Sequence, residues 1–254
     1  MKTLFVAAIL FCSACPFAFA GPNAGGTLVV YADSTITYTD GDVNQYCTEY
    51  EVSDCPIGGA NLPPGSPDVW HVWAVIAFFP ASSSPVLGGV FFGVAYDPTA
   101  VYVGDYRCCG DDQAPSPGWP GPDTGVMVFW DPPETGHSVT VYWFAGWGGS
   151  GATFCLTAFP GEESGYFWDG QRAVDPVAGL GCLGFGTDSG FVPCPEDALA
   201  CCRSDGSCEV LLEYLCNELG GQPYPPFVSC EPNPCPPPTP TTMETWGRIK
   251  ANHR

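Results

Sequence analysis

Cysteine density constrains this chain more than any other feature. Of its 15 cysteines, 13 follow residue 20, and none of those 13 belongs to a C-x-x-C pair. Zinc sites ordinarily use such pairs, whereas a dense set of other spacings in an exported chain indicates disulfide bonds. Disulfides persist outside the reducing cytosol, so the sequence predicts a secreted, extracellular or cell-surface protein held together by covalent cross-links.

The first 20 residues predict export. After a basic second residue, Leu4 to Phe11 forms a compact apolar run, and Ala18-Phe19-Ala20 is the small-x-small pattern that signal peptidase cuts. We therefore place cleavage after Ala20. Two alternatives stay open. A membrane anchor would need roughly 20 apolar residues, more than this run offers. Lipidation would fall on Cys15, although Cys12 stands where leucine is expected.

An odd number of mature cysteines leaves one thiol over. We take Cys194, which lies between the two cysteine groups, as the unpaired one, and expect Cys47 to bond to Cys55. Adjacent cysteines are expected to bond to different partners, and the rest of the connectivity stays open because spacing does not determine it. The cysteines expected in disulfides are Cys47, Cys55, Cys108, Cys109, Cys155, Cys182, Cys201, Cys202, Cys208, Cys216, Cys230 and Cys235.

The charge of the chain excludes some partners. Between Gly21 and Pro240 there are 26 acidic residues and three basic ones, a formal excess of 23 negative charges. Nucleic acid is excluded as a partner, because phosphate contacts need lysine and arginine. The hydrophobic fraction, 45%, is nevertheless that of a globular protein. An acidic surface of this kind favours solubility and attracts divalent cations.

Residues 21–193 are predicted to form one all-β domain, a β-sandwich. Short runs rich in Val, Phe, Tyr and Trp alternate with Gly, Pro, Asp and Ser clusters, which is the pattern of strands and turns. The run from Val69 to Phe79 is apolar on both faces, which places it in the middle of the sandwich. The predicted strands are Thr27–Tyr31, Thr35–Tyr38, Val69–Phe79, Gly89–Tyr96, Val101–Tyr106, Gly125–Trp130, Ser138–Ala145 and Ala152–Phe159.

Residues 194–235 are predicted to form a small disulfide-rich module. Seven cysteines in 42 residues leave little room for a core, so cross-links have to hold it. Asp205-Gly206 predicts a hairpin turn, and Glu213 to Leu219 a short helix that ends at Gly220-Gly221. Residues 236–254 then form a proline-rich linker and a basic tail.

The module resembles a six-cysteine repeat of an uncharacterised secreted bacterial protein family. Its carrying residues are Ala200-Cys201-Cys202, Asp205-Gly206-Ser207-Cys208, Glu213, Cys216, Gly220-Gly221, Ser229-Cys230 and Pro232-Asn233-Pro234-Cys235-Pro236. Leu212, in place of a helix-capping threonine, and Pro225-Pro226, in place of a glycine turn, depart from it. The resemblance implies secretion and disulfides but no reaction.

Two further stretches carry resemblances. Ser84 to Pro98 is similar to a domain that accompanies such repeats, as are Val141-Tyr142-Trp143-Phe144-Ala145 and Gly181 to Gly186. Tyr96 to Val101 resembles locally the corner of cohesin-type sandwiches. The tail, Glu244 to Lys250, resembles a TWGRIK-type C-terminal motif of related chains, for which sorting or attachment is the expected role.

Catalytic motifs are missing from the sequence. There is no nucleophile elbow, no H-E-x-x-H and no phosphate loop. His71 lies within an apolar strand, where a structural histidine is the better interpretation. Paired carboxylates would suit a glycosidase, but among 27 acidic residues some pairs are expected by chance. We therefore expect a non-enzymatic protein without a cofactor.

Calcium is the metal that the sequence favours. Asp40, Asp42 and Asn44 place oxygen ligands at alternate positions, and Glu51 stands at the twelfth position of the loop. Gln45 occupies the sixth position, where glycine permits the sharp turn of a calcium loop. The alternative is a solvated turn between strands.

Trp119, Trp147 and Trp168 are the candidate ligand-binding residues. Each lies near glycine or proline in a loop, where a flat ring can stand exposed and stack on a sugar; packing into the core is the alternative. We predict a structural or binding protein that recognises extracellular glycan or protein. Two alternatives are a polysaccharide hydrolase that uses two carboxylates and a cohesin-like assembly domain. Oligomeric state stays open.

Overall fold

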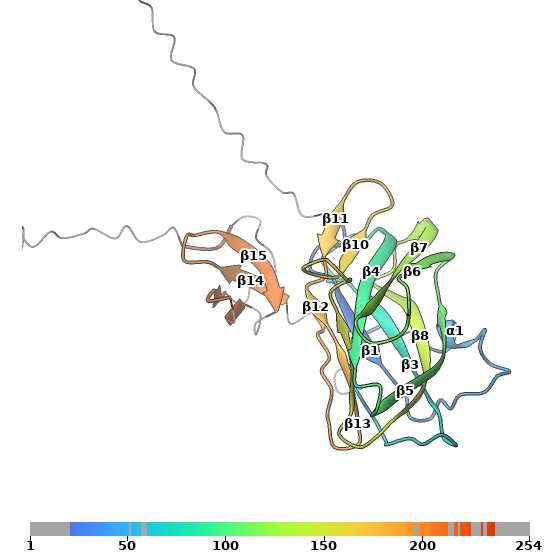
Figure 1. Cartoon of the computed structure of the whole chain (residues 1–254). Helices are drawn as coiled ribbons and strands as arrows, with labels where there is room; N and C mark the ends of the chain where they lie inside the picture. Colours follow the sequence, from blue (N-terminus) through green and yellow to red (C-terminus); the bar gives the residue numbers. More distant parts are fainter. Residues whose placement is uncertain are drawn as a thin grey trace, which may run out of the picture.

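A computed structural model describes residues 21–50, 52–56, 60–195, 198–212, 216–217, 219–224, 230 and 233–236. The predicted signal peptide, including Cys15, and the basic tail lie outside these residues, as does most of the predicted helix from Glu213 to Leu219. The described residues form an all-β protein with two large sheets, a separate three-stranded sheet and one short helix (Figure 1). Within them, no helix combines the length and apolar character that spanning a bilayer requires.

The first sheet has five strands. β1 pairs in parallel with β12 and antiparallel with β3, and β8 lies between β3 and β5. Across the sheet the strands are β12 (Gly179–Leu180), β1 (Thr27–Tyr31), β3 (His71–Phe78), β8 (Ser138–Gly148) and β5 (Val101–Cys108).

The second sheet has eight strands and packs against the first (Figure 1). β4 is its centre, with β10 and β9 along one edge and β7 along the other. The strands are β11 (Val174–Pro176), β10 (Tyr166–Trp168), β4 (Leu87–Tyr96), β9 (Thr153–Thr157), β13 (Cys182–Phe185) and β2 (Asn61–Leu62), with β7 (Thr124–Glu134) and β6 (Asp112–Pro115) paired beside β4.

The sandwich and seven of its eight predicted strands are confirmed, within a few residues at their ends. The exception is Thr35–Tyr38, which makes only an isolated bridge between Thr37 and His71. This segment belongs to a chain excursion rather than to a sheet, so its alternating pattern reflects packing onto the sheet face. The strands of the sandwich that the sequence did not predict, β2, β6 and β10 to β13, have two to four residues each.

The main core lies between the two sheets. From β3 it receives Trp73, Val75 and Ala77, and from β4 it receives Val90, Phe92 and Val94, all fully buried. Successive side chains of a strand point to opposite faces, so these alternate positions share one face.

A second core explains why β3 is apolar on both faces. The other face of β3 carries Val72, Ala74 and Ile76, which are also fully buried. They are covered by the excursion after β1, which contains α1 (Tyr46–Glu49). Tyr46 packs edge-on against Trp143 with ring centroids 5.0 Å apart. β3 therefore lies between β1 and β8 within its sheet, and its two faces are covered by the second sheet and by the excursion after β1.

Three disulfides tie the sandwich together. Cys47–Cys109 holds the excursion to the end of β5, Cys55–Cys194 joins it to the segment after β13, and Cys155–Cys182 links β9 to β13. The expected Cys47–Cys55 bond is therefore wrong, and Cys194 is paired.

Among the cysteines of the described residues, Cys108 is the free one. The prediction that it forms a disulfide is wrong because adjacent strand residues face opposite ways. Cys108 packs against the main core, whereas Cys109 packs with the second core, where Cys47 lies. Burial raises the pKa of the Cys108 thiol.

The disulfide-rich module is built on β14 (Ala198–Cys202), β15 (Cys208–Leu212) and β16 (Gln222–Pro223). As predicted, Asp205-Gly206 forms the turn between β14 and β15, with Gly206 at φ 83°. Three cross-links hold the module, Cys201–Cys216, Cys202–Cys235 and Cys208–Cys230.

Candidate functional site

Four aromatic side chains gather at one end of the outer face of the five-stranded sheet. Tyr38 packs on Trp70 with ring centroids 5.2 Å apart, and Trp70 meets Tyr102 edge-on at 5.6 Å. Tyr102 in turn stacks on Trp147 at 6.1 Å with an interplanar angle of 26°. We call these four residues the aromatic surface. Of the sequence candidates, Trp147 belongs to it.

Strand register assembles the aromatic surface. Tyr102 of β5 lies directly opposite Trp147 of β8, so both side chains rise from the same face. Trp70 precedes β3, and its indole Nε1–H donates to the carbonyl of Pro67 at 3.1 Å. A methyl group on Gly104 would collide with the Trp70 ring, so the absence of a side chain there gives Trp70 its place.

The aromatic surface is accessible to solvent. Tyr102 is 47% exposed, and Val69 beside Trp70 is 50% exposed, whereas Trp70, Trp147 and Tyr38 are half-buried. One exposed ring beside three half-buried ones leaves a partly accessible apolar patch at this end of the sheet, which makes the patch a candidate site for a ligand.

Two carboxylates adjoin the aromatic surface. The hydroxyl of Tyr38 lies 2.9 Å from Oδ1 of Asp40 and 2.8 Å from Oδ2 of Asp105. Desolvation, together with these two carboxylates, raises the pKa of Tyr38. The phenol therefore stays protonated and donates. Oδ1 of Asp105 also accepts from the backbone N–H of Tyr106 at 2.8 Å, so among the described residues Oδ2 of Asp40 is the oxygen of this pair without a partner. The other carboxylate oxygens each keep a second lone pair that can accept from a ligand hydroxyl.

Trp119 and Trp168 do not join the aromatic surface. For Trp119 the structure shows the alternative of packing into the core: it is 8% exposed, and its Nε1–H donates to the hydroxyl of Tyr142 at 2.9 Å. Its loop folds back because the ring packs against Phe92 and the indole N–H finds this buried partner.

Trp168 lies on the other sheet. It packs edge-on against Phe129, and Phe129 packs against Phe91, which contacts Phe159. These four half-buried rings form a row on the outer face of the eight-stranded sheet. The two tryptophans Trp147 and Trp168 thus lie on different sheets and cannot bind one small ligand together.

The expected calcium ligands have other partners. Asp40 accepts from Tyr38, Asp42 accepts from the hydroxyl of Thr39, and the amide oxygen of Asn44 accepts from Arg107. Glu51 lies outside the described residues. Within the described part of the chain, no group of three His, Cys, Asp or Glu side chains is placed to hold a metal ion.

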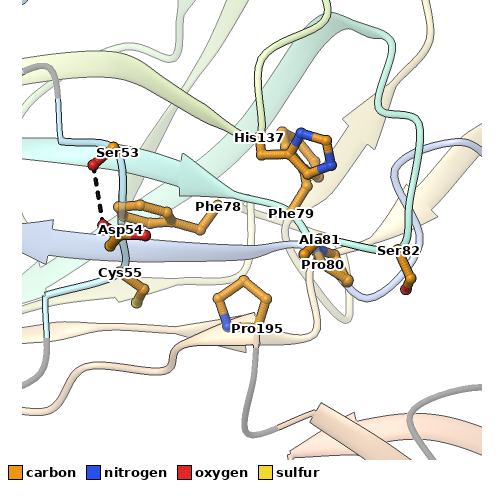
Figure 2. Close-up of a pocket in the computed structure, with 10 residues that line it drawn as sticks. All are labelled: Ser53, Asp54, Cys55, Phe78, Phe79, Pro80, Ala81, Ser82, His137 and Pro195. Atoms are coloured by element: carbon orange, nitrogen blue, oxygen red, sulfur yellow. Dashed lines mark hydrogen bonds between the residues drawn. The ribbon is translucent and has the colours of Figure 1, made fainter.

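A pocket of about 500 Å³ opens beside the Cys55–Cys194 bond (Figure 2). Its walls are largely apolar, and its polar groups are the hydroxyls of Ser53 and Ser82, the carboxylate of Asp54 and the ring of His137. Asp54 is the single carboxylate among the described residues that line it. A glycosidase requires two, so this pocket does not fit the hydrolase alternative.

His71 is buried without a ring partner. It is 5% exposed, and neither ring nitrogen has a hydrogen-bond partner among the described residues. Desolvation lowers its pKa below the ordinary 6.5, because burial disfavours the charged ring. A neutral histidine in such a strand supports the structural interpretation over a catalytic one.

We expect His71 to make stability depend on pH. The unfolded chain gains a proton at His71 below about pH 6.5, while the folded chain resists it, so the free energy of unfolding falls as pH decreases through that point. Replacing it (His71→Gln) should flatten this fall between pH 7 and pH 5, measured by urea denaturation. The exposed His137→Gln is the control and should keep it. An unchanged pH profile in His71→Gln would contradict the assignment.

Comparison with known proteins finds similarity to cohesin modules. One from a family 33 glycoside hydrolase of Clostridium perfringens is 8% identical, with a TM-score of 0.40 over 63% of this chain and 96% of that one. The sixth cohesin of scaffoldin B from Acetivibrio cellulolyticus is 12% identical, with a TM-score of 0.37 over 50% and 93%. A non-cellulosomal cohesin from Archaeoglobus fulgidus is 15% identical, with a TM-score of 0.37 over 51% and 88%.

These similarities are too distant to transfer a partner to this chain. No protein-family model matches it, and no curated protein sequence is significantly similar.

Proposed function

We propose that this is a secreted, non-enzymatic protein that binds neutral glycan through the aromatic surface. The observation that carries the proposal is the stacked pair Tyr102 and Trp147, with Tyr102 47% exposed, on a sheet face beside two carboxylates. A flat ring contacts the C–H face of a sugar, and Asp40 and Asp105 accept hydrogen bonds from its hydroxyl groups. Both contacts are held on strands or by packed neighbours, which limits the ordering cost of binding.

Charge selects the class of glycan. The domain carries a large negative excess, and the two carboxylates nearest the aromatic surface add to the local field. Uronic-acid and sulfated polysaccharides would be repelled, since like charges disfavour association. We therefore expect neutral polysaccharides to bind better than anionic ones.

Removing one ring tests the proposal. Tyr102→Ala and Trp147→Ala should each weaken binding to an array-selected neutral glycan by at least about tenfold, as expected for a central contact worth more than ~1.4 kcal/mol. Titration calorimetry on the folded variants measures the affinity. Trp168→Ala, on the opposite sheet, is the matched control and should bind like the parent.

Gly104→Ala gives a finer test. Gly104 lies on the edge strand β5, so the variant should still fold. Its added methyl group collides with the ring of Trp70, and the variant should lose affinity because that ring is displaced. If Tyr102→Ala, Trp147→Ala and Gly104→Ala all bind like the parent, the aromatic surface is not the binding site.

A hydrolase is the second candidate, because Asp40 and Asp105 converge on one hydroxyl. Incubation of the protein with the bound polysaccharide separates the two functions. Release of reducing ends that Asp105→Asn abolishes would replace the binding proposal with a hydrolytic one; binding without release supports the first.

A further inference from the structure

The chain is anchored into the sandwich from Gly21 onward. The backbone nitrogen of Gly21 lies 2.6 Å from Oδ1 of Asp175, and that of Asn23 lies 3.0 Å from Oδ2. Asp175 belongs to β11 and is only 3% exposed. One buried carboxylate therefore receives both of these nitrogens.

The neighbouring residue secures this arrangement. Asn23 is fully buried, and its side-chain amide pairs with the backbone of Val86, donating to the carbonyl at 2.7 Å and accepting from the N–H at 3.0 Å. A side chain at position 21 would collide with the Asp175 carboxylate and with Ala173, so glycine is required there. The start of the described chain is thus fitted to Asp175.

Gly21 stands immediately after the expected cleavage site. Ala18-Phe19-Ala20 is the pattern that signal peptidase cuts, and Gly21 follows it. Hydrolysis adds water across the Ala20–Gly21 peptide bond, which leaves a carboxylate on Ala20 and an amine on Gly21. An α-amino group is largely protonated at neutral pH.

We propose that cleavage after Ala20 creates an α-ammonium group on Gly21 that forms a part-buried ion pair with Asp175, so that removal of the leader completes the fold. Before cleavage, the carboxylate receives a neutral amide in the same place. After cleavage, it receives a full positive charge at hydrogen-bond distance, and such charge-assisted bonds are the stronger ones.

The surroundings of Asp175 favour a cationic partner. Burial raises the pKa of Asp175, and the negative charge of Asp169 acts in the same direction, while the N–H groups of Gly21 and Asn23 oppose it. Asp169 itself is held by the backbone N–H groups of the turn that precedes β11. An ammonium at Gly21 would offset both the burial and the repulsion.

A one-residue extension tests the ion pair. The mature chain starting at Gly21 is compared with a chain that keeps Ala20, which moves the ammonium by about 3.8 Å and restores a neutral amide at Gly21. The Gly21 form should melt roughly 2–4 °C higher, because a charge-assisted hydrogen bond to Asp175 replaces a neutral one. In the Asp175→Asn background that difference should vanish, whereas the exposed Glu163→Gln should preserve it.

Two measurements cover the cases in which a variant does not fold. N-terminal sequencing of the secreted protein should give Gly21, and a different first residue would overturn the proposed processing. The rate at which acetic anhydride modifies the Gly21 amine of the native protein, followed against pH by mass spectrometry, should reveal a raised pKa relative to the unfolded chain. Equal reactivity in both states, or equal melting of the two chain lengths, would overturn the ion pair.

Discussion

Replacing Cys47 and Cys109 together by alanine is expected to lower the free energy of unfolding by about 4 kcal/mol. The bond joins residues 62 positions apart, and the chain-entropy account assigns about that much to a loop of such length. It also holds α1 against the sheet, where Tyr46 covers Trp143. Urea denaturation followed by tryptophan fluorescence measures the loss.

The module supplies a control for this experiment. Removing Cys202–Cys235 by the same alanine substitutions deletes a cross-link of separation 33 within the disulfide-rich module. The unfolding of the sandwich should then stay near that of the parent. If the Cys47 and Cys109 variant also unfolds like the parent, the excursion is held by packing alone and the cross-link adds nothing to stability.

Strand patterns in the sequence were sufficient to predict the sandwich. In a long strand, the sequence of apolar and polar side chains shows which residues are buried, because successive side chains point to opposite faces. β1 matches its predicted bounds, and β3, β4, β5, β7 and β8 were found within a few residues. The strands from β10 to β13 were not, because each has only two to four residues and depends on its neighbours for pairing. A run that short contains too little periodicity to separate it from a turn.

Disulfide partners and ring directions depended on tertiary contacts. Cys108 and Cys109 are equivalent in the sequence, yet Cys108 packs against the main core and Cys109 against the second core. The alternation of side chains along β5 is also interrupted by an irregularity between Val103 and Asp105, so the facing of its residues cannot be counted from Tyr102. Trp119 lies in a Pro-Gly-Trp-Pro stretch, which is typical of an exposed loop. Its ring is nevertheless buried, because the indole N–H donates a hydrogen bond to the buried hydroxyl of Tyr142.

Three residues of the aromatic surface, Tyr38, Trp70 and Tyr102, were not among the sequence candidates, and the last two were missed for a related reason. Trp70 lies in a continuous apolar run and was assigned to the core with the rest of it. Parity within that run was a usable signal, since Trp70 faces opposite to His71 and Trp73. Tyr102 gave no signal of its own, because its exposure depends on the position of β5 at the edge of the sheet.

Trp73→Ala is expected to destabilise the sandwich by about 3–5 kcal/mol, the range for deleting a fully buried large side chain. Trp73 has no exposed surface and packs against Phe144, Phe154 and Phe185, with ring centroids between 5.4 and 6.2 Å away. The truncation leaves a cavity where both sheets meet. Thermal and urea denaturation, analysed as one cooperative transition, measure the change.

Trp73→Phe separates packing from polarity at the same position. The indole Nε1–H of Trp73 is buried and has no hydrogen-bond partner among the described residues, an arrangement that costs about 1–3 kcal/mol. Phenylalanine loses part of the ring but also removes this unsatisfied donor, so its cost should be less than about half that of alanine. A phenylalanine variant as unstable as the alanine variant would contradict this expectation. It would mean that the indole Nε1–H of Trp73 is satisfied in the folded protein, for example by a bound water, and that ring volume alone does not account for the stability of this core.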